Sequence, residues 1–419
     1  MSSRVKRWWA RWLGRGDAGG SVPPFDGVLK PNQRLETAEV LAHFEHPADM
    51  AIDSGNLWVA DGPRVWQVDP FDGSRREIAV FDDAVTALAG AGQKMAVALG
   101  GRRVRLISLT GGAAGPKPAV ADASAREWNR AGQASFVSVN SLSFLPDGSL
   151  LATEGSAHFE CDRWSHDLMS LGHSGRLVRL DLDGTATVLK DDLEFAFGAC
   201  AMADGRIWVS ESWRHRVLSI SPQLPSAVVP PASTAASSRP PNGGQTPVLD
   251  RLPGYPSRLS PAPGGGAWLT VFTCRTQLVE MVLREPEFRR RMVAEVDPRY
   301  WVAPALSSGH SFLEPLQGGG VKTMGVLKPW APPRSYGLVI RLAADGRMAE
   351  AMHSRVGGRH HGVVAAVQLG SNLYALAKGS GCVLRIPLPD TATTTAPTAS
   401  SAPAPGVLSS PLALHTIRA

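Results

Sequence analysis

The chain has 419 residues, of which 43% are hydrophobic and 19% charged, so it is neither disordered nor too short to bury a large core. The net charge is +6, but a good part of the positive excess lies near the N-terminus. No stripe of Lys and Arg alternates with aromatic residues elsewhere, which argues against a nucleic-acid partner. The four cysteines are widely spaced without a CxxC pair, which favours reduced thiols in a cytoplasmic protein over a zinc framework or a disulfide-rich scaffold.

Residues 1–35 form a basic leader that we expect to be flexible. The stretch MSSRVKRWWARWLGRG lacks the continuous apolar core of a signal peptide, and no run of the chain is apolar over the length of a membrane span. As a helix, residues 4–15 would gather Trp8, Trp9 and Trp12 among Arg and Lys, a composition suited to peripheral contact with an anionic membrane. A frayed, solvated tail is the simpler interpretation, and we prefer it.

Residues 36–387 repeat one phrase six times: an apolar strand that ends in a turn, a second apolar strand, a gap and a third strand. The second strands read GNLWVADG from Gly55, QKMAVALG from Gln93, GSLLATEG from Gly148, GRIWVSES from Gly205, GGAWLTVF from Gly265 and SNLYALAKG from Ser371. One such unit exposes two apolar faces and cannot bury them alone. All-β units that stack radially form a propeller, so the sequence predicts an all-β fold, a six-bladed β-propeller.

The ends of the repeat region indicate how the ring closes. The strand ETAEVLAHF (36–44) precedes the first full unit and has no partner of its own, while the sixth unit ends abruptly after LRIPL. An open ring would leave an unpaired strand edge. We therefore expect the N-terminal strand to complete the last blade.

Two insertions and a tail interrupt or follow the repeats. Residues 222–245 are rich in Pro, Ser and Ala and are predicted to be a flexible insert, and the Thr/Ala/Pro/Ser tail 388–419 is predicted to be disordered. Residues 273–334 carry helical periodicity broken by Pro286 and predict a helical hairpin that projects from blade five as a cap. The apolar faces expected on its two helices comprise Leu278, Val282 and Leu283, and then Phe288, Met292 and Val296.

The candidate site follows from the propeller. The first strand of each blade lines the central channel, and its opening residues face one mouth, where ligands bind by default. These strands open at Pro47, Ala84, Val139, Phe197, Tyr255 and His361. The predicted catalytic residues are His361, Arg258 and Asp49, and the predicted substrate-binding residues are Asn140, Ser257, His360, Phe197 and Trp164.

These residue types suggest a chemistry. A His beside a carboxylate acts as a general base near neutral pH, which is the role expected for His361 beside Asp49. Arg258 is expected to hold a carboxylate or to stabilise an oxyanion. The ligand predicted from this set is a small molecule that is anionic or bears a carbonyl group. The alternative, which stays open, is that these residues only bond to one another and to water.

A long loop, 154–175, joins two strands of the third repeat. It carries His158, Cys161, His166 and His173, whose spacing fits no zinc pattern. We expect a structural loop that lines the pocket, with Trp164 packed over the channel mouth, and no metal site.

Several separated stretches resemble one family. GRLVRLDLDGTATVLKDDLEFAFGACAMADGRIWVSESWRHRVLSI from Gly175, LPGYPSRL at 252–259 and REPEFRRRM from Arg284 resemble strictosidine synthase-like proteins, over roughly 25–387. Those proteins belong to a wider group of six-bladed propellers with the gluconolactonases, regucalcin and the paraoxonases. The resemblance implies a small-molecule site at the channel mouth.

The resemblance also implies what the site lacks. The hydrolase members hold Ca²⁺ with a Glu, two Asn and an Asp, and the matching positions here read Ala48, Asn140, Phe197 and Ser257-Arg258. Only Asn140 is kept, and Arg258 places a positive charge where a cation would bind, so calcium is disfavoured and no cofactor is expected.

The synthase members use a Glu near the start of the sixth blade for a Pictet–Spengler condensation. The stretch GRHHGVVAAV has none at the matching position, on or beside Gly362, so this reaction is not expected. The resemblance favours a hydrolase of lactone or ester type. The alternative is a non-catalytic propeller that binds a small molecule or a partner.

Overall fold

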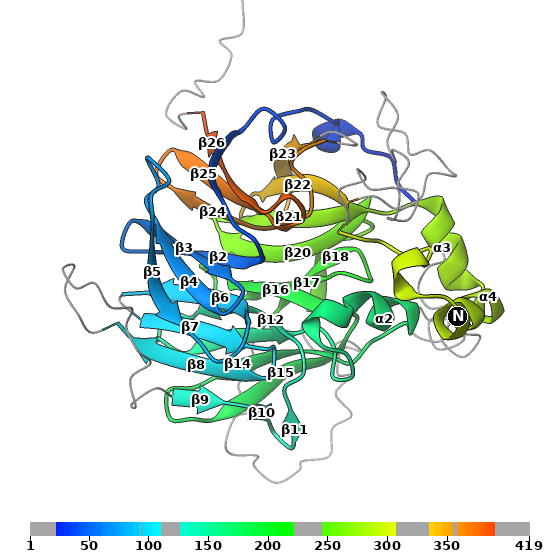
Figure 1. The fold of residues 1–419 in the computed structure, drawn as a ribbon, viewed down its shortest axis with the longest axis horizontal. Coiled ribbons are helices and arrows are strands. Elements are labelled where there is room, and N and C mark those ends of the chain that lie inside the picture. The colour runs from blue at the N-terminus through cyan, green and yellow to red at the C-terminus, as the bar shows by residue number, and fades with distance from the viewer. Residues whose placement is uncertain are drawn as a thin grey trace, which may run out of the picture.

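The computed structural model describes residues 22–92, 94–109, 126–221, 245–306, 335–354 and 358–389. Within them, six four-stranded sheets are arranged in a ring, which confirms the predicted six-bladed propeller (Figure 1). Three predictions lie outside these ranges: the membrane contact over 4–15, nearly all of the insert 222–245, and the tail 388–419 beyond its first two residues. No helix in the described part of the chain has the length and apolar character needed to cross a membrane.

The blades follow one another in chain order, and each runs antiparallel from its inner strand outward. Blades one and two are β2 (Pro47–Asp53), β3 (Asn56–Asp61), β4 (Arg64–Val68), β5 (Arg75–Val80), then β6 (Val85–Ala91), β7 (Lys94–Leu99), β8 (Arg103–Ser108), β9 (Arg126–Trp128). Blades three and four are β12 (Val139–Phe144), β13 (Leu150–Glu154), β14 (Gly175–Leu180), β15 (Ala186–Leu193), then β16 (Ala196–Ala201), β17 (Ile207–Glu211), β18 (Arg216–Ile220), β19 (Gln245–Leu249).

Blade five is β20 (Gly254–Pro261), β21 (Ala267–Cys274), β22 (Ser335–Leu342) and β23 (Met348–His353). Blade six is β24 (Val363–Leu369), β25 (Asn372–Ala377), β26 (Cys382–Pro387) and β1 (Glu39–His43). A short hairpin, β10 (Arg130–Ala131) and β11 (Ala134–Ser135), lies between blades two and three. The second strands of the blades are buried on both faces because each blade packs against two neighbours; every residue of β13 and of β21 is buried.

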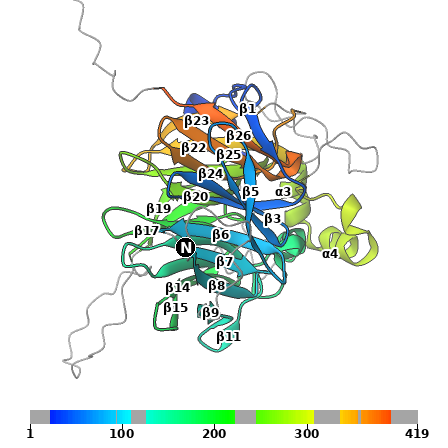
Figure 2. The ribbon, with the colours of Figure 1, turned by 60° about the vertical axis from the view of Figure 1, so that its left-hand side comes forward.

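The ring closes as predicted. Strand β1 pairs antiparallel with β26, with Val40 opposite Leu384, so the N-terminal strand is the outer strand of blade six. The first and last strands of the described residues therefore share one sheet (Figure 2). This pairing removes the open edge that the sixth unit would otherwise present.

The last part of the predicted leader is packed, contrary to expectation. A 3₁₀ turn, η1 (Gly27–Leu29), follows Phe25, and both Phe25 and Leu29 are buried against blade five. The Asn32 side chain bonds in both directions to the outer strand β23, donating to Ala351 O at 2.8 Å and accepting from His353 N at 2.9 Å. Residues 22–35 thus cover the edge of blade five, because they supply an apolar anchor and satisfy exposed strand backbone.

The helical hairpin from blade five is present. It comprises α3 (Gln277–Arg284), capped by the Thr276 side chain, then α4 (Pro286–Glu295) and η3 (Pro298–Tyr300), and it extends beyond the disc (Figure 2). Val282 and Leu283 are buried as expected. On α4 the buried residues are Arg289 and Met292, so Met292 is the one member of the expected apolar face that is buried.

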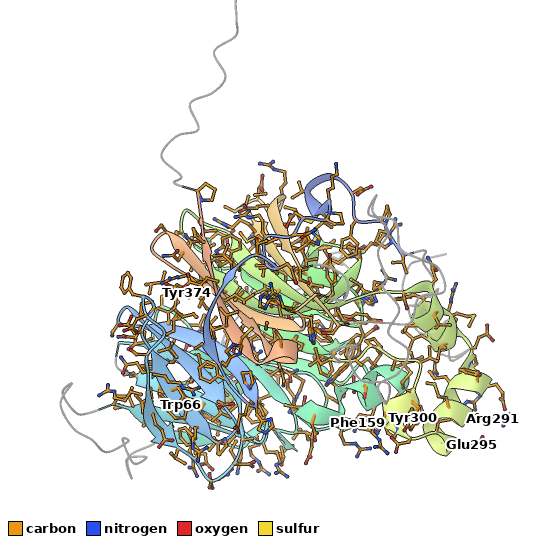
Figure 3. The ribbon with its side chains drawn as sticks, turned by 45° about the horizontal axis from the view of Figure 1, so that its top comes forward. Trp66, Phe159, Arg291, Glu295, Tyr300 and Tyr374 are labelled. Atoms are coloured by element: carbon orange, nitrogen blue, oxygen red, sulfur yellow. The ribbon has the colours of Figure 1, made fainter. Side chains whose placement is uncertain are left out.

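The expected apolar face of α4 is therefore wrong in part. Phe288 is 53% exposed and Val296 is 39% exposed. They border a surface groove on the outer side of the hairpin, where Tyr300, Arg291 and Glu295 also lie (Figure 3). The hairpin packs on the disc through α3, while α4 faces outward.

Candidate functional site

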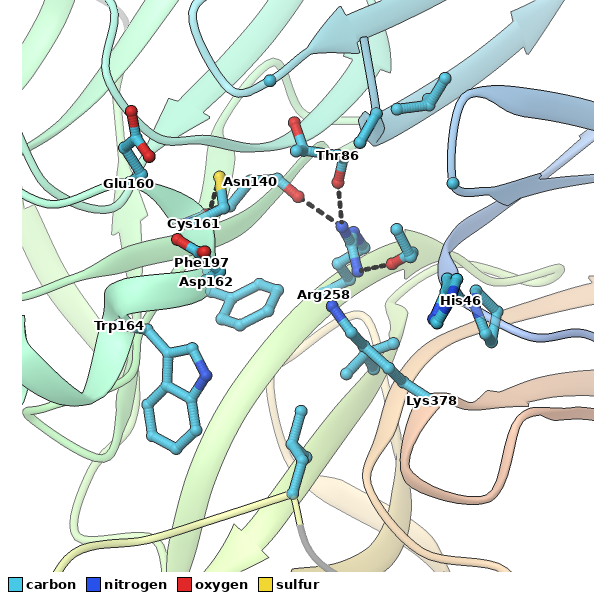
Figure 4. A pocket seen from close by; sticks show the side chains of 18 of the residues that line it. His46, Thr86, Asn140, Glu160, Cys161, Asp162, Trp164, Phe197, Arg258 and Lys378 are labelled. Atoms are coloured by element: carbon cyan, nitrogen blue, oxygen red, sulfur yellow. Dashed lines mark hydrogen bonds between the residues drawn. The ribbon is translucent and has the colours of Figure 1, made fainter. Parts of the chain in front are cut away.

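A cavity of about 510 Å³ opens at the mouth of the central channel (Figure 4). Its volume lies within the roughly 300–1,000 Å³ typical of small-molecule sites. One wall is apolar and mostly aromatic, and consists of Trp164, Phe195, Phe197, Phe272, Leu306 and Val364. Trp164 comes from α2 (Trp164–Met169), which follows η2 (Cys161–Arg163) in the long loop of blade three, and Leu306 comes from the blade-five insertion.

Each inner strand contributes to this cavity through a β-bulge. Near its first residues every inner strand has a bulge with one residue more than the facing segment of its partner strand, so the pairing register shifts there; in blade five an opposite shift, between Tyr255 and Pro256, precedes the bulge. A bulge re-aims side chains and leaves backbone groups out of the ladder. The residues at these bulges that line the cavity are Ala48, Thr86, Asn140, Phe197, Arg258 and Val364.

The Arg258 guanidinium occupies the floor of the cavity. Nη1 donates to Ala48 O at 3.0 Å, and Nη2 donates to Thr86 O at 2.9 Å and to Asn140 O at 2.6 Å. One side chain from blade five thereby joins the bulged backbone of blades one, two and three. Gly198 makes this possible, since a side chain there would collide with the Arg258 backbone. The Phe197 ring covers the guanidinium with its centroid 5.3 Å away.

Asp49, which does not line the cavity, neutralises the charge of Arg258. Its Oδ1 lies 3.0 Å from Arg258 Nε and accepts from Met50 N, while Oδ2 accepts from Leu88 N at 2.8 Å. Burial raises the pKa of Asp49 to about 6, although Arg258 and the two backbone donors act to lower it. Burial also lowers the pKa of Arg258. For both partners the cost of burial thus exceeds their mutual attraction, as is common for buried ion pairs.

Lys378 is the functional candidate that the sequence analysis missed. It lies in the 3₁₀ turn η4 (Lys378–Ser380) after β25, and its side chain extends into the cavity beside Arg258 (Figure 4). Among the described residues its side chain has no hydrogen bond or ion pair. The side chain is exposed to the solvent space of the cavity, but protein surrounds that space. This enclosure lowers the pKa of the Lys378 ammonium, the Arg258 charge lowers it further, and Cys161, Asp49 and Asp162 oppose the change.

A signal for Lys378 does exist in the sequence. In an antiparallel blade the second strand ends beside the beginning of the inner strand; Ala377 pairs with Val363. Residues that follow the second strand therefore share the mouth with residues that open the first. The Lys of SNLYALAKG stands at this position, which does not belong to the opening residues of an inner strand.

The predicted site residues divide into two groups. Asn140, Phe197, Arg258 and Trp164 line the cavity, whereas Asp49, Ser257, His360 and His361 do not. Ser257 Oγ lies 2.7 Å from Thr270 Oγ1, inside blade five. The geometry therefore gives the predicted base–carboxylate pair no access to a ligand.

The two histidines support blade six. His361 Nδ1 lies 2.7 Å from Ser335 Oγ, and His360 is buried with Nδ1 3.7 Å from Cys382 Sγ. Burial lowers the pKa of His360. His361 also packs under the Lys378 turn, because a side chain at Gly379 would collide with its ring. Its position is that of a support for Lys378.

The loop with three histidines and Cys161 does not gather them. His173 Nδ1 is 2.9 Å from Asp192 Oδ1, and the His166 ring lies 4.7 Å from that of Trp301. Burial raises the pKa of Cys161 to about 11, so its thiol is protonated at neutral pH. No three His, Cys, Asp or Glu side chains are placed to hold a metal in the described ranges.

The cavity opening is bordered by acidic groups. Glu160, Asp162 and Asp83 line it, and Arg102 pairs with two of them, at 3.3 Å from Glu160 and 3.5 Å from Asp83. The inner part of the cavity carries Arg258 and Lys378. Since Asp49 neutralises Arg258, the charge left for a ligand at the base of the cavity is that of Lys378.

No family model and no curated protein sequence matches the chain. Solved structures match it at low identity. A gluconolactonase from Xanthomonas campestris is 14% identical, with a TM-score of 0.50 over 88% of this chain and 96% of its own. A luciferin-regenerating enzyme is 13% identical, with a TM-score of 0.50 over 85% of this chain and 94% of its own. Regucalcin from Agrobacterium tumefaciens, a calcium-binding protein, is 11% identical, with a TM-score of 0.48 over 84% and 93%.

These likenesses concern the propeller fold. The first two structures share its architecture over nearly their whole length. None of the three is a strictosidine synthase, so that resemblance stays a prediction from the sequence.

Proposed function

We propose that the protein acts on a small molecule with an apolar body and a carbonyl group, bound in the central cavity, and that hydrolysis of a lactone or ester is the favoured reaction. The observation that carries this proposal is the position of Lys378. Its ammonium has no partner in the described residues and faces a mostly aromatic wall. Such a pairing of one polar group with an apolar surface orients a ligand.

The chemistry expected from these residues is polarisation of the carbonyl. The Lys378 ammonium donates to the carbonyl oxygen and stabilises the oxyanion that forms when water attacks the carbonyl carbon. Asp162 lines the same cavity and is available to accept the proton of that water. The tetrahedral intermediate then expels the alkoxide, which takes up the proton that Asp162 accepted. The aromatic wall holds the apolar part of the molecule and excludes bulk water.

A calcium ion does not fit this cavity. The bulge carbonyls of Ala48, Thr86 and Asn140 already accept hydrogen bonds from Arg258. A cation placed among them would meet the guanidinium charge and would find its oxygen ligands occupied. We therefore propose a reaction that needs no metal.

A second candidate is a binding protein without catalysis. It is favoured by one observation, that neither Asp49 nor His361 lines the cavity. Without this histidine–carboxylate pair in contact with the ligand, Lys378 would serve to hold an anionic or carbonyl-bearing ligand.

The test compares wild-type protein with Lys378→Met on a panel of lactones and aryl esters, with and without chelator. A matched control is Lys94→Met, since Lys94 is an exposed lysine at the start of β7 in blade two. We expect turnover that is lost in Lys378→Met, kept in Lys94→Met and unaffected by chelator. Saturable binding of the same compounds with no consumption would favour the binding protein, and turnover that survives Lys378→Met would refute the proposed site.

A further inference from the structure

We propose that the Lys378 amine forms an imine with an aldehyde or ketone ligand, so that the cavity captures this class of carbonyl compound covalently. The inference rests on the proposed ligand site, but not on hydrolysis. It assigns to Lys378 a nucleophilic role in place of a purely electrostatic one.

The first observation is that Lys378 differs from the other cations near the mouth. Arg258 donates to three carbonyls and contacts Asp49, and Arg102 pairs with Glu160 and Asp83. Lys378 has no such partner in the described residues. A nitrogen without a carboxylate partner can release a proton and present its lone pair at small cost.

The second observation is the surroundings of the amine. The cavity encloses it between an apolar wall and the Arg258 guanidinium, with which it shares the cavity base (Figure 4). An apolar pocket and a second cation are the two conditions that activate lysine as a nucleophile. Both act in the same direction here, since each lowers the pKa of Lys378.

The third observation is that the backbone carrying Lys378 is fixed. Its amide nitrogen donates to Gly362 O at 3.0 Å, and its carbonyl accepts from Gly381 N at 3.4 Å. Gly379 seats the turn directly on the His361 ring. A fixed turn restricts the amine to the cavity, which favours a single reactive geometry over the many open to a surface lysine.

The reaction balances with what is present. The Lys378 ammonium releases a proton to water, the neutral amine adds to the carbonyl carbon, and the proton lost by nitrogen is taken up by the carbonyl oxygen, which gives the carbinolamine. Its hydroxyl takes up a proton from water and leaves as water, which gives the protonated imine. From ammonium to protonated imine the net change is one water released and no oxidation. An ester or lactone cannot follow this course, because attack at its carbon expels an alkoxide. The ligand class is thus an aldehyde or ketone with an apolar body small enough for about 510 Å³.

The experiment traps the imine in full-length protein. Wild type, Lys378→Met, Lys378→Arg and Lys94→Met are treated with low concentrations of cinnamaldehyde and sodium cyanoborohydride, and the reduced adducts are followed by intact mass and peptide mapping. We expect one adduct at Lys378, formed at least 10-fold faster than at any other lysine and with a rate that saturates in aldehyde. Both Lys378 variants should lose this fast phase, and Lys94→Met should keep it.

Two controls keep the result interpretable. Thermal unfolding of each variant verifies folding, and Lys378→Arg retains the charge without an amine nucleophile. Adducts spread evenly over surface lysines, or a fast adduct that persists in Lys378→Arg, would overturn the imine. If esters are hydrolysed in a Lys378-dependent way and no adduct forms, the proposed function stands and this inference fails. If the adduct forms and no ester is hydrolysed, the inference stands and hydrolysis fails.

Discussion

Two regions of one cavity each hold a positively charged side chain, and the two side chains differ in how they are bonded. At the floor, Arg258 is held by three backbone carbonyls and a carboxylate from three neighbouring blades. Beside it, Lys378 of blade six projects into the cavity, and its side chain has no hydrogen bond or ion pair among the described residues. The same sign of charge at the same mouth thus serves two purposes. A cation that bonds to three backbone carbonyls and pairs with a carboxylate stabilises the ring, whereas one without such bonds remains available to a ligand.

The largest effect is expected from removing the bonded cation. Arg258→Met would leave Asp49 buried without its counter-charge and three carbonyls without donors. Loss of one partner of a buried pair costs about 3–5 kcal/mol. Urea unfolding measures this against Arg347→Met, a control whose exposed pair with Asp345 is screened by solvent and should contribute little to stability. Equal stability of the two variants would contradict the structural role of Arg258.

The reverse pattern is expected from the unbonded cation. Lys378→Met should lower kcat/KM for the best ester about 10²–10³-fold, the usual effect of removing one oxyanion donor. Its free energy of unfolding should stay within about 0.5 kcal/mol of wild type, because no interaction within the described protein is lost. A Lys378→Met variant that is strongly destabilised, or fully active, would contradict the proposed difference in role between Lys378 and Arg258.

The pH dependence of stability sharpens the role of the floor. Because the pKa of Asp49 is raised to about 6, the folded protein binds a proton that the unfolded chain releases near pH 4. The protonated Asp49 contributes about 3 kcal/mol to the free energy of unfolding. This contribution is complete below about pH 4 and is lost as the pH rises to about 6. The difference in unfolding free energy between wild type and Asp49→Asn should fall over this window. A difference that rises with pH would show that attraction to Arg258 exceeds the cost of burial.

The smallest effect is expected from metal. Chelator or added Ca²⁺ should leave the melting temperature and the activity unchanged, since Arg258 occupies the carbonyls a cation would need. Differential scanning fluorimetry tests this. A rise in melting temperature with Ca²⁺ that disappears in Asn140→Ala would indicate a metal site at the mouth.

The sequence predicts the scaffold far better than the site. The six inner strands, the closing strand β1 and the blade-five hairpin follow from periodicity and turn residues, and these expectations agree with the structure. Side-chain direction at the mouth does not follow, because a bulge interrupts the two-residue alternation in each inner strand. Ala48 therefore lines the cavity where Asp49 was expected.

The sixth blade shows the same limit. The inner strand begins at Val363, two residues after the predicted opening at His361, and it is Val364 at the bulge that lines the cavity. Lys378 was missed because it follows the second strand and reaches the mouth from the other side of the hairpin. A bulge and a strand end are set by tertiary packing, which a single sequence does not display.

The bulges of the inner strands also suggest how this mouth accepts change. The residues concerned are Ala48, Thr86, Asn140, Phe197, Arg258 and Val364. Their side chains meet at one place although the ladder pairing of each blade is made by their neighbours. A substitution at any of them except Arg258 alters the shape or polarity of the cavity while leaving strand pairing intact. The propeller thus offers five positions around one fixed cation at which substitutions can change the ligand preference of the protein.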